Sequence, residues 1–570
     1  MLGKDTSLSF KPVYKQERGL DLATLKSNIL VASIICQIVR NTIGPYSVNK
    51  AIIKKDGEVL ITGDAFTILR NLKAEHPVAR ILIGMAKAQN AVVGDGVATA
   101  VILAGEFLRK AEILMDEGLL PSTIIKGFEL ALKRATMKLE EIAIPVKPGD
   151  EGILRKSASA AINTKIVSSP ETVNEFSKLA LKLAEHVISE ISGKTRMNIE
   201  DIKVIKKRGG SLSDSYIVDG NVIEDREIVQ PDMPRRVENA NVALMRSLEL
   251  KEISGSWWEA LGKNMRIQVR ALEEHKAFLE KRVAIVKEMV NRLVSCGVNV
   301  ALVNKGIDEI VEHYLTRVGI LTVKRVFLPD INRISKLTGA SIVSDIFNED
   351  LTSDKLGKAE VVEEWKPSEK ENYVLIRGCP NKGASSVIIR GGNEYALEEA
   401  ERSLYDALHA IRNIKEDPRI LPGGGASEME LSKCLGEYAQ TFEGKEQLAI
   451  SAYAEAMRIV PQTLANNAGL DTLQILTELK AKHSEGNVWA GVNVIDVGVD
   501  DMQKVGIYDP LKVKVHALNA ATDVARIVLR IDQIIPAKDH RKEEKEEPKP
   551  ETETGKEQVD ALKKVYDLKL

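Results

Sequence analysis

Apolar residues recur along this chain with helical spacing near both ends and with strand-like spacing in the middle. The helical stretches are too densely apolar for exposed helices and predict buried ones. These stretches are residues 25–40, 79–118, 121–142, 444–459 and 513–535. Between the first two, Ala51–Thr62 carries Asp56-Gly57 at its centre and predicts a β-hairpin.

The middle of the chain has a different pattern. Residues 201–223 alternate like strands separated by glycine turns, and short apolar strands follow within 242–250, 298–307 and 319–326. A helix is predicted at Leu272–Val294. Strands that alternate with helices are typical of α/β domains. We therefore expect a helical domain built from both chain ends, with an α/β insert between them and a first boundary near 145–152.

Composition narrows the class of protein. The 570 residues are 44% hydrophobic and 28% charged, with a formal net charge of −2. This balance is typical of soluble multidomain proteins and gives no global basic field for nucleic acid or an acidic membrane surface. The basic cluster at Lys203–Gly210 is too short to change that. No apolar run approaches the roughly 20 residues that span a bilayer, so we expect neither a nucleic-acid nor a membrane partner.

The cysteines and the tail add two expectations. Cys36, Cys296, Cys379 and Cys434 lie far apart, without metal-ligand spacing or a disulfide framework. No signal peptide is visible, so the pattern predicts a cytoplasmic protein. Beyond Lys538 the chain is charged and nearly free of apolar residues, which predicts disorder.

The tripeptide Gly94-Asp95-Gly96 precedes a long apolar helix and suggests a phosphate site. Two glycines bring backbone N–H groups close to a phosphate, and the helix N-terminus adds partial positive charge. An aspartate would repel a bare phosphate. A Mg²⁺ ion bound between the carboxylate and the phosphate removes that repulsion. The Lys-Ser/Thr ending of a P-loop is missing. A tight turn in which Asp95 caps the next helix explains the same residues, so both interpretations stay open here.

Further segments extend this pattern in order. They read NTIGPYSVNKAII from Asn41, ERSLYDALHAIRN from Glu401, LPGGGASEMEL from Leu421 and GIYDPLKVKVHALNAATDVARIVLRIDQII from Gly506. Together with the glycine-aspartate-glycine segment they resemble the group II chaperonins, the thermosomes of archaea and their eukaryotic cytosolic counterparts. The resemblance covers about residues 15–537 and is most like a divergent thermosome subunit of gamma type.

The resemblance implies a chaperonin fold with three domains. The helical equatorial domain is discontinuous, an intermediate domain carries the hinge, and an α/β apical domain carries a helical protrusion. The implied bounds are 1–150 and 405–537 for the equatorial domain, 151–220 and 371–404 for the intermediate domain, 221–370 for the apical domain with its protrusion near 250–275, and 538–570 for the tail.

It also implies an ATPase that uses Mg²⁺. Asp95 matches the metal-binding carboxylate, Asp406 the aspartate that positions the attacking water, and Asp64 a second acid near the γ-phosphate. The nucleotide-binding positions are Gly44, Pro45, Gly94, Asp95, Gly96, Val97, Ala98, Thr99, Lys165, Gly424, Gly425 and Asp501. From the residues alone, Asp406 is better explained as a solvated helix residue, and Lys165 is equally well explained as an ordinary surface lysine.

The chain departs from the family pattern at these loops. Val97 and Ala98 replace the two threonines of GDGTT, Ser47 replaces a loop glycine, and Ala65 replaces the glycine after Asp64. Losing one hydrogen bond to a charged group costs about 1.5–3 kcal/mol. Because all three acids persist, we expect a functional but altered ATP site. The alternative is a structural or regulatory subunit that hydrolyses ATP weakly.

The resemblance implies partners as well. They are paralogous subunits of a double ring, joined by strand pairing between chain termini and the hairpin, and non-native client proteins. Trp257 and Trp258 fall at the protrusion, where they contact clients or a neighbouring lid segment, or else pack locally. A nucleic-acid or membrane-associated filament protein is the remaining alternative, and the near-neutral charge argues against it.

Overall fold

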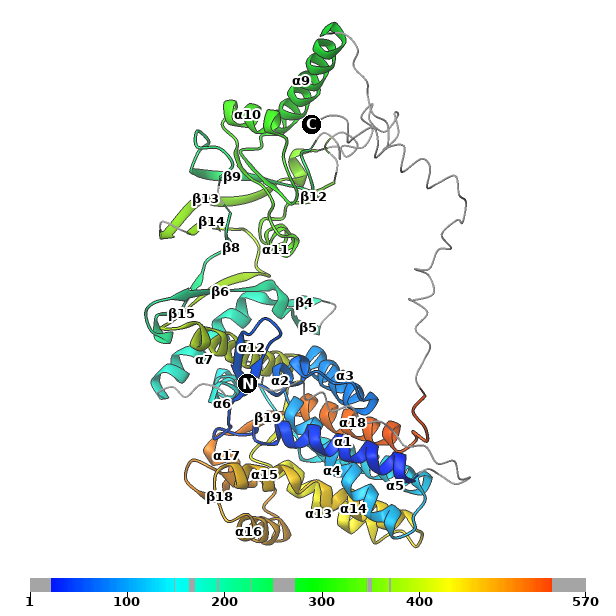
Figure 1. Ribbon diagram of the computed structural model, residues 1–570. Helices are drawn as coiled ribbons and strands as arrows, with labels where there is room; N and C mark the ends of the chain where they lie inside the picture. Colours follow the sequence, from blue (N-terminus) through cyan, green and yellow to red (C-terminus); the bar gives the residue numbers. More distant parts are fainter. Residues whose placement is uncertain are drawn as a thin grey trace, which may run out of the picture. The chain divides into compact units, whose positions relative to one another are not determined.

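Two groups of apolar helices, one from each half of the chain, form a single bundle (Figure 1). α4 (Val97–Asp116) and α5 (Pro121–Ile142) pack against α14 (Glu446–Ala456) and α18 (Leu511–Val528). Their buried rings meet inside: Phe107 and Tyr453 stack with centroids 4.1 Å apart. The Tyr453 hydroxyl is 2.8 Å from that of Thr522 on α18. A helical domain built from both chain ends is thereby confirmed.

The structure is a computed structural model. It describes residues 22–147, 149–163, 170–191, 194–226, 228–249, 272–344, 346, 351–368 and 371–535. Lys26–Arg530 forms one compact unit. The chain ends, Met1–Leu25 and Ile531–Leu570, form a second unit, of which only residues 22–25 and 531–535 are described.

The remaining helices of the two ends include some within the predicted stretches and several for which no range was predicted. They are α1 (Leu22–Arg40), α2 (Ala65–Asn71), α3 (Pro77–Val92), α13 (Ala426–Ala439), α15 (Ile459–Asn467), α16 (Thr472–Ser484) and α17 (Met502–Val505). The predicted helix 79–118 is divided into α3 and α4 by a turn that contains Gly94 and Gly96, both at positive φ. Positive φ breaks helical geometry and is natural only for glycine. The predicted helix 121–142 has the bounds of α5.

The insert contains a seven-stranded mixed sheet whose order is β11-β10-β9-β13-β14-β8, with β12 also paired to β9. Its strands are β8 (Asn221–Ile223), β9 (Arg236–Met245), β10 (Val300–Val303), β11 (Leu321–Val323), β12 (Ile342–Val343), β13 (Gly357–Ser368) and β14 (Glu371–Arg377). β9, β10 and β11 are parallel, as crossover helices require. Those helices are α9 (Leu272–Ser295), α10 (Glu309–Arg317) and α11 (Leu328–Thr338). The predicted α/β insert is confirmed.

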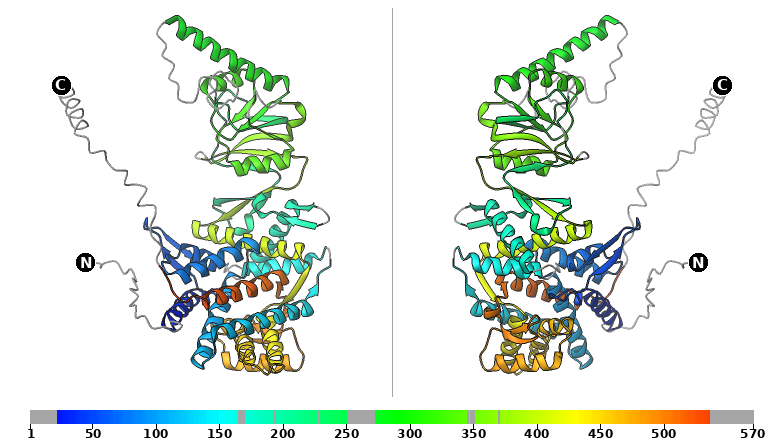
Figure 2. Two further views of the ribbon diagram at one scale, coloured as in Figure 1. Left: turned by 90° about the vertical axis from the view of Figure 1, so that its right-hand side faces the viewer. Right: turned by 90° about the vertical axis from the view of Figure 1, so that its left-hand side faces the viewer.

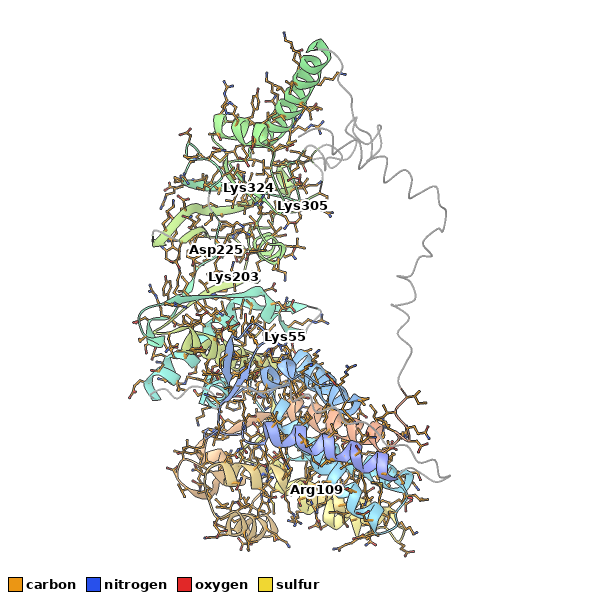
Figure 3. All side chains as sticks on the ribbon, in the orientation of Figure 1. Lys55, Arg109, Lys203, Asp225, Lys305 and Lys324 are labelled. Carbon is orange, nitrogen blue, oxygen red and sulfur yellow. The ribbon has the colours of Figure 1, made fainter. Side chains whose placement is uncertain are left out.

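A smaller sheet and three helices connect this insert to the bundle segments. The sheet is β6 (Ile202–Arg208), β15 (Ser385–Gly391) and β7 (Tyr216–Val218), and the helices are α6 (Glu151–Asn163), α7 (Pro170–Val187) and α12 (Glu394–Glu416). Lys203 on β6, labelled in Figure 3, pairs with Asp330 on α11 at 3.0 Å. The basic cluster at Lys203–Gly210 is therefore engaged in ion pairs within the fold. Lys206 pairs with Glu401, and Lys207 pairs with Glu371.

Short strands and turns complete the described chain. Three strands form one sheet, and three pairs form hairpins. They are β19 (Tyr508–Pro510), β16 (Arg419–Pro422) and β3 (Ile144–Pro145) in the sheet, and β1 (Lys50–Ile53) with β2 (Val59–Thr62), β4 (Ile188–Ile191) with β5 (Lys194–Met197), and β17 (Ala490–Asn493) with β18 (Gly498–Asp501) as hairpins. Single 3₁₀ turns are η1 (Ile199–Asp201), η2 (Leu212–Asp214) and η4 (Ser353–Lys355). The predicted hairpin at Ala51–Thr62 is confirmed, with Ala51 opposite Ile61.

Several expectations fall outside the described residues. Lys165, Trp257, Trp258 and the tail beyond Lys538 are among them, as is most of the predicted protrusion at 250–275. α9 begins at Leu272 and extends beyond the sheet, as both views of Figure 2 show. The domain bounds stay a prediction.

One described helix, Ala23–Arg40, is long and apolar enough to cross a membrane by length and composition alone. A third of this stretch is buried (33%), and Cys36 Sγ contacts the Val101 carbonyl of α4 at 3.0 Å. Core helices pass the same test, so this is weak evidence for a membrane span. All four cysteines are free.

Candidate functional site

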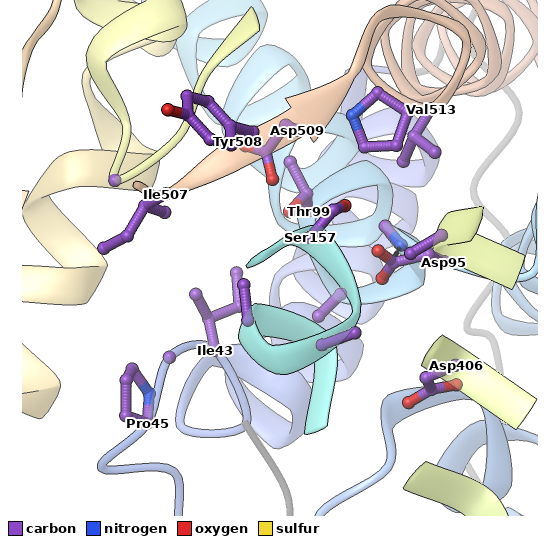
Figure 4. Close-up of a pocket in the computed structure, with 18 of the residues that line it drawn as sticks. Ile43, Pro45, Asp95, Thr99, Ser157, Asp406, Ile507, Tyr508, Asp509 and Val513 are labelled. Atoms are coloured by element: carbon purple, nitrogen blue, oxygen red, sulfur yellow. Dashed lines mark hydrogen bonds between the residues drawn. The ribbon is translucent and has the colours of Figure 1, made fainter. Parts of the chain in front are cut away.

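A cavity of about 540 Å³ lies where the glycine-rich turns of both chain halves meet (Figure 4). Most predicted site residues line it, although they come from distant segments. They are Gly44, Pro45, Asp64, Gly94, Asp95, Gly96, Val97, Ala98, Thr99, Asp406, Gly424 and Gly425. Asp501 does not line it: its carboxylate caps α17 by accepting from the Gln503 N–H at 2.9 Å.

The turn between α3 and α4 requires glycine at both ends of its aspartate. A Cβ on Gly94 would lie 2.0 Å from Cγ of His409, and one on Gly96 would lie 2.9 Å from Cγ1 of Val513. Both glycines have φ above +70°. The backbone here is therefore packed against α12 and α18, and no larger residue fits without moving them.

Asp95 is not the N-cap of α4. That position belongs to Gly96, in the left-handed conformation, and no side chain makes a capping hydrogen bond there. Oδ1 of Asp95 instead accepts from the adjacent Gly96 N–H at 2.5 Å. The first N–H groups of α4 have no acceptor within the helix, and its first turn, Val97–Thr99, lines the cavity.

A buried amide supports this turn from behind. Gln89 is fully buried, and its Nε2 donates to the Asp95 carbonyl at 2.8 Å. Its Oε1 lies 2.5 Å from Nδ1 of His516 on α18. Since an amide oxygen only accepts, Nδ1 carries the proton. Burial, with Lys512 adding to it, lowers the pKa of His516. Sequence reasoning missed both side chains, because nothing in their spacing relates them to the turn.

Asp406 reaches the cavity because α12 is tied to the same turn. Asn413 Nδ2 donates to the Val93 carbonyl at 2.8 Å, and Arg412 Nη2 donates to the Val92 carbonyl at 2.7 Å. Asn413 is fully buried. These contacts fix the rotation of α12, and Asp406 lies two turns earlier on that helix. Asp406 and Asp95 therefore line one cavity although they are far apart in sequence.

Asp64 has a structural role as well as its place on the wall. Its Oδ2 accepts from the Thr67 N–H at 2.8 Å and the Thr67 hydroxyl at 2.6 Å, which makes it the N-cap of α2. A cap of this kind stabilises a helix by about 0.5–2 kcal/mol. The side chain is therefore held in place, and substitution at Asp64 changes stability as well as the cavity.

The other two glycine turns bring backbone to the opposite wall. Gly44 has φ of 89°, and a Cβ there would lie 2.9 Å from Cδ2 of Leu464. Gly425 is the N-cap of α13, again without a capping side chain. Beside these turns the lining is apolar, with Val460, Leu464, Val492, Val494, Ile495 and Ile507. The cavity thus has a polar end and an apolar end.

Several lining residues carry charged, hydroxyl or amide groups that sequence reasoning did not single out. They are Arg155, Lys156, Ser157 and Ser159 on α6, Asn174 on α7, Asp509 on β19 and Lys514 on α18. The α6 residues belong to an ordinary amphipathic pattern, so only the fold relates them to the site. Asp509 lies in the segment that begins at Gly506, one of those that carry the resemblance. It lines the cavity, whereas Asp501 does not.

The donor set fits Mg²⁺ that binds together with a phosphate ligand. Asp64, Asp95 and Asp406 offer carboxylate oxygens, the donors that Mg²⁺ prefers. Among the described residues, no group of three or more acidic, His or Cys side chains could hold a metal alone. Mg²⁺ is commonly held by one or two carboxylates with substrate phosphates supplying further oxygens, which agrees with this arrangement.

Comparison with known proteins identifies the family. The TCP-1/cpn60 chaperonin family model matches residues 35–539. A thermosome subunit from Pyrococcus horikoshii is 42% identical over 523 residues, covering 92% of this chain and 93% of that protein. Thermosome subunit alpha from Archaeoglobus fulgidus is 40% identical over 534 residues, covering 94% of this chain and 95% of that protein. Thermosome subunit beta from the same organism is 40% identical over 519 residues, covering 91% of this chain and 93% of that protein.

A solved structure agrees with these relatives. The open-state monomer of a group II chaperonin from Methanococcoides burtonii superposes with a TM-score of 0.58 at 36% sequence identity. The match covers 77% of this chain and 100% of that chain. The gamma-type assignment stays a prediction. The fold and these relatives confirm the resemblance, and the chain belongs to the TCP-1/cpn60 chaperonin family as a group II chaperonin subunit.

Proposed function

We propose that this chaperonin subunit binds ATP with Mg²⁺ in the cavity of about 540 Å³ and hydrolyses it to drive the folding of enclosed non-native proteins. One observation carries the proposal. Asp64, Asp95 and Asp406, predicted from three separate segments, line one cavity together with three glycine turns. Chance packing would not collect three acids and several positive-φ glycines around one cavity.

The two ends of the cavity suit the two ends of a nucleotide. The polar end has the first turn of α4, whose N–H groups favour a phosphate. Arg155 and Lys156 add positive charge to the lining. The apolar end, with Val460, Val492 and Ile507, suits a planar base, and the carboxylate of Asp509 suits sugar hydroxyls.

In this scheme each acid has a distinct task. Asp95 would hold Mg²⁺, which neutralises charge on the phosphates when bound. Asp406 would orient the attacking water, and Asp64 would constrain the same region from its place at the start of α2. Phosphoryl transfer depends mainly on positioning and charge stabilisation, so acids fixed on separate rigid elements are what the reaction needs.

A second candidate function rests on a specific observation. Val97 and Ala98 both line the cavity where the family pattern has threonines, so two hydroxyls are missing from its wall. Thr99 and the backbone N–H groups remain. A subunit that binds ATP but hydrolyses it weakly is therefore the alternative, and in a mixed ring its neighbours would supply the hydrolysis.

We also propose that the subunit works in a double ring with paralogues. The relatives from one organism are named as subunits alpha and beta, which supports a hetero-oligomer. The hairpin β1–β2 carries exposed apolar side chains, with Ile53 76% and Ile61 42% exposed. Apolar groups on an accessible hairpin suit contact with a neighbouring subunit. The cytoplasmic location stays a prediction.

Titration of fluorescent ATP with and without Mg²⁺ tests the proposal. Asp95→Ala should abolish the Mg²⁺-dependent part of binding and leave the thermal melt nearly unchanged, because Asp95 does not cap α4. Asp116→Ala is a matched control, since Asp116 is an exposed acid at the other end of the same helix. A melting shift for Asp95→Ala without a change in ATP binding would contradict the proposed site.

A further inference from the structure

A buried lysine on α18 holds one of the acids of the cavity wall. Nζ of Lys514 lies 3.0 Å from Oδ2 of Asp509 and 2.5 Å from Oε1 of Glu428. The side chain of Lys514 is only 12% exposed, and that of Glu428 is 3% exposed. Buried ion pairs often contribute little net stability, since removing charges from water offsets their attraction. Stability alone therefore explains this cluster poorly.

The lysine stays charged inside the fold. Burial by itself would lower its pKa, but Asp509 and Glu428 together raise the pKa of Lys514 above its usual value. The ammonium group of Lys514 therefore remains available to pair with both Glu428 and Asp509. Glu428 fixes it from the core side, where it lies on buried α13, and Asp509 meets it from the cavity side.

Asp509 is held but still faces the cavity. It lies on β19, opposite Leu421 of β16, and its side chain is 33% exposed. Lys514 engages Oδ2, which leaves Oδ1 outside this ion pair on a residue that lines the cavity. A carboxylate accepts hydrogen bonds and does not donate them. The wall therefore presents an oriented acceptor suited to hydroxyl groups.

The neighbours of Asp509 place this acceptor between the two ends of the cavity. Ile507, two residues earlier, belongs to the apolar lining. Val513, next to Lys514, packs against the turn at Gly96 on the polar side. Figure 4 shows Asp509 beside Tyr508, with Ile507 on one side of the view and Asp95 on the other. A nucleotide with its base at the apolar end has its sugar in this middle region.

We propose that Lys514, anchored by Glu428, is a positioning residue that orients Asp509 to recognise the sugar hydroxyls of the nucleotide. The inference rests on the proposed function, because it assumes ATP in this cavity. It assigns to the cluster a role in selecting ribonucleotides, which is separable from phosphate and metal binding at the other end.

Competition between ATP and 2′,3′-dideoxy-ATP, both with Mg²⁺, tests this role. The wild-type protein should prefer ATP by about ten- to hundredfold, the range expected for a hydrogen bond to a charged group. The double variant Lys514→Met/Glu428→Gln removes both buried charges together, so neither is left unpaired. Its preference should fall to within about twofold while its affinity for the dideoxy nucleotide is kept.

Three further proteins make the result specific. Lys514→Arg keeps the charge and should keep most of the preference. Glu428→Gln alone loosens the anchor but leaves Lys514 paired, so it should lower the preference partway even if the double variant does not fold. Lys512→Met is the matched control on the same helix, since Lys512 pairs with Glu416 outside the cavity; it should behave as wild type.

The outcomes separate this inference from the proposed function. Equal affinity of the wild-type protein for both nucleotides, or an unchanged preference in the folded double variant and in Glu428→Gln, would overturn the role of Lys514 alone. An equal loss of affinity for both nucleotides in the double variant would also overturn the role of Lys514, because it would indicate general damage to the cavity. If the wild-type protein binds neither nucleotide, the proposed function fails and this inference fails with it.

Discussion

At the scale of single residues, the site depends on glycines and acids whose surroundings leave little freedom. Gly94 lies under the ring of His409, which stands one turn after Asp406 on α12. The backbone of the proposed phosphate turn and the helix of the proposed water-positioning acid are therefore in direct contact. A change at either one alters the distance between the two acids.

Gly94→Ala should lower both stability and ATP affinity. Its Cβ would collide with His409, and positive φ costs a non-glycine residue about 1–2 kcal/mol. Gly94→Ala/His409→Ala removes the collision but not the backbone strain, so it should recover part of each loss. Thermal melts and nucleotide titration measure both effects. A Gly94→Ala protein that matches wild type would show that the turn packs differently.

Ala98 offers a test of the missing hydroxyls. Ala98→Thr restores a donor at a cavity-lining position of α4 and should tighten Mg²⁺-ATP binding by about tenfold or more, given about 1.5–3 kcal/mol for a hydrogen bond to a charged group. Ala98→Val has the same shape without the hydroxyl and serves as the control. Equal affinities for the two variants would show that these hydroxyls do not limit binding.

At the scale of elements, the local sequence pattern predicted the helices whose bounds are set by nearby residues. Pro121 at the first turn and a clear apolar period give α5 its predicted bounds. The helix predicted at 513–535 ends earlier, at Val528, because apolar content alone does not mark a helix end. The apolar pattern runs through 79–118 without a break, and only the glycines of Gly94-Asp95-Gly96 indicated the turn that divides the stretch into α3 and α4.

The site was predictable in its acids but not in its supports. The family resemblance singled out Asp64, Asp95 and Asp406, and all three line the cavity. Gln89 contacts His516 427 residues away, Asn413 contacts Val93 320 residues away, and Lys514 contacts Glu428 86 residues away. No local spacing encodes such contacts. Asp501 was named from the sequence and Asp509 was not singled out; in the fold Asp501 caps α17, whereas Asp509 lies on β19 and lines the cavity.

The hairpin β1–β2 is the element we expect to join subunits. Deleting the segment before Thr24 should weaken ring formation, because it removes the strand proposed to pair with a neighbouring hairpin, whereas trimming after Lys538 should not. Native mass spectrometry or light scattering reports the assembly. Rings that form normally after the N-terminal deletion would refute this mode of assembly.

At the scale of the whole molecule, the cavity joins segments from both chain halves and from the connecting helices α6 and α12. Lys203 and Asp330 in turn link β6 of the small sheet to α11 beside the seven-stranded sheet. Occupation of the cavity can therefore bias elements that lead away from it. The proposed coupling of ATP hydrolysis to client folding would use this continuity.

Single-turnover ATP hydrolysis tests the central claim most directly. Purified wild-type protein and Asp406→Ala would be compared with Mg²⁺, alone and in mixed rings, after ATP binding has been verified for both. The account predicts hydrolysis by the wild-type protein and a rate at least about a hundredfold lower for Asp406→Ala, the scale of one positioned catalytic group. A wild-type rate equal to that of Asp406→Ala, with ATP bound by both, would contradict it.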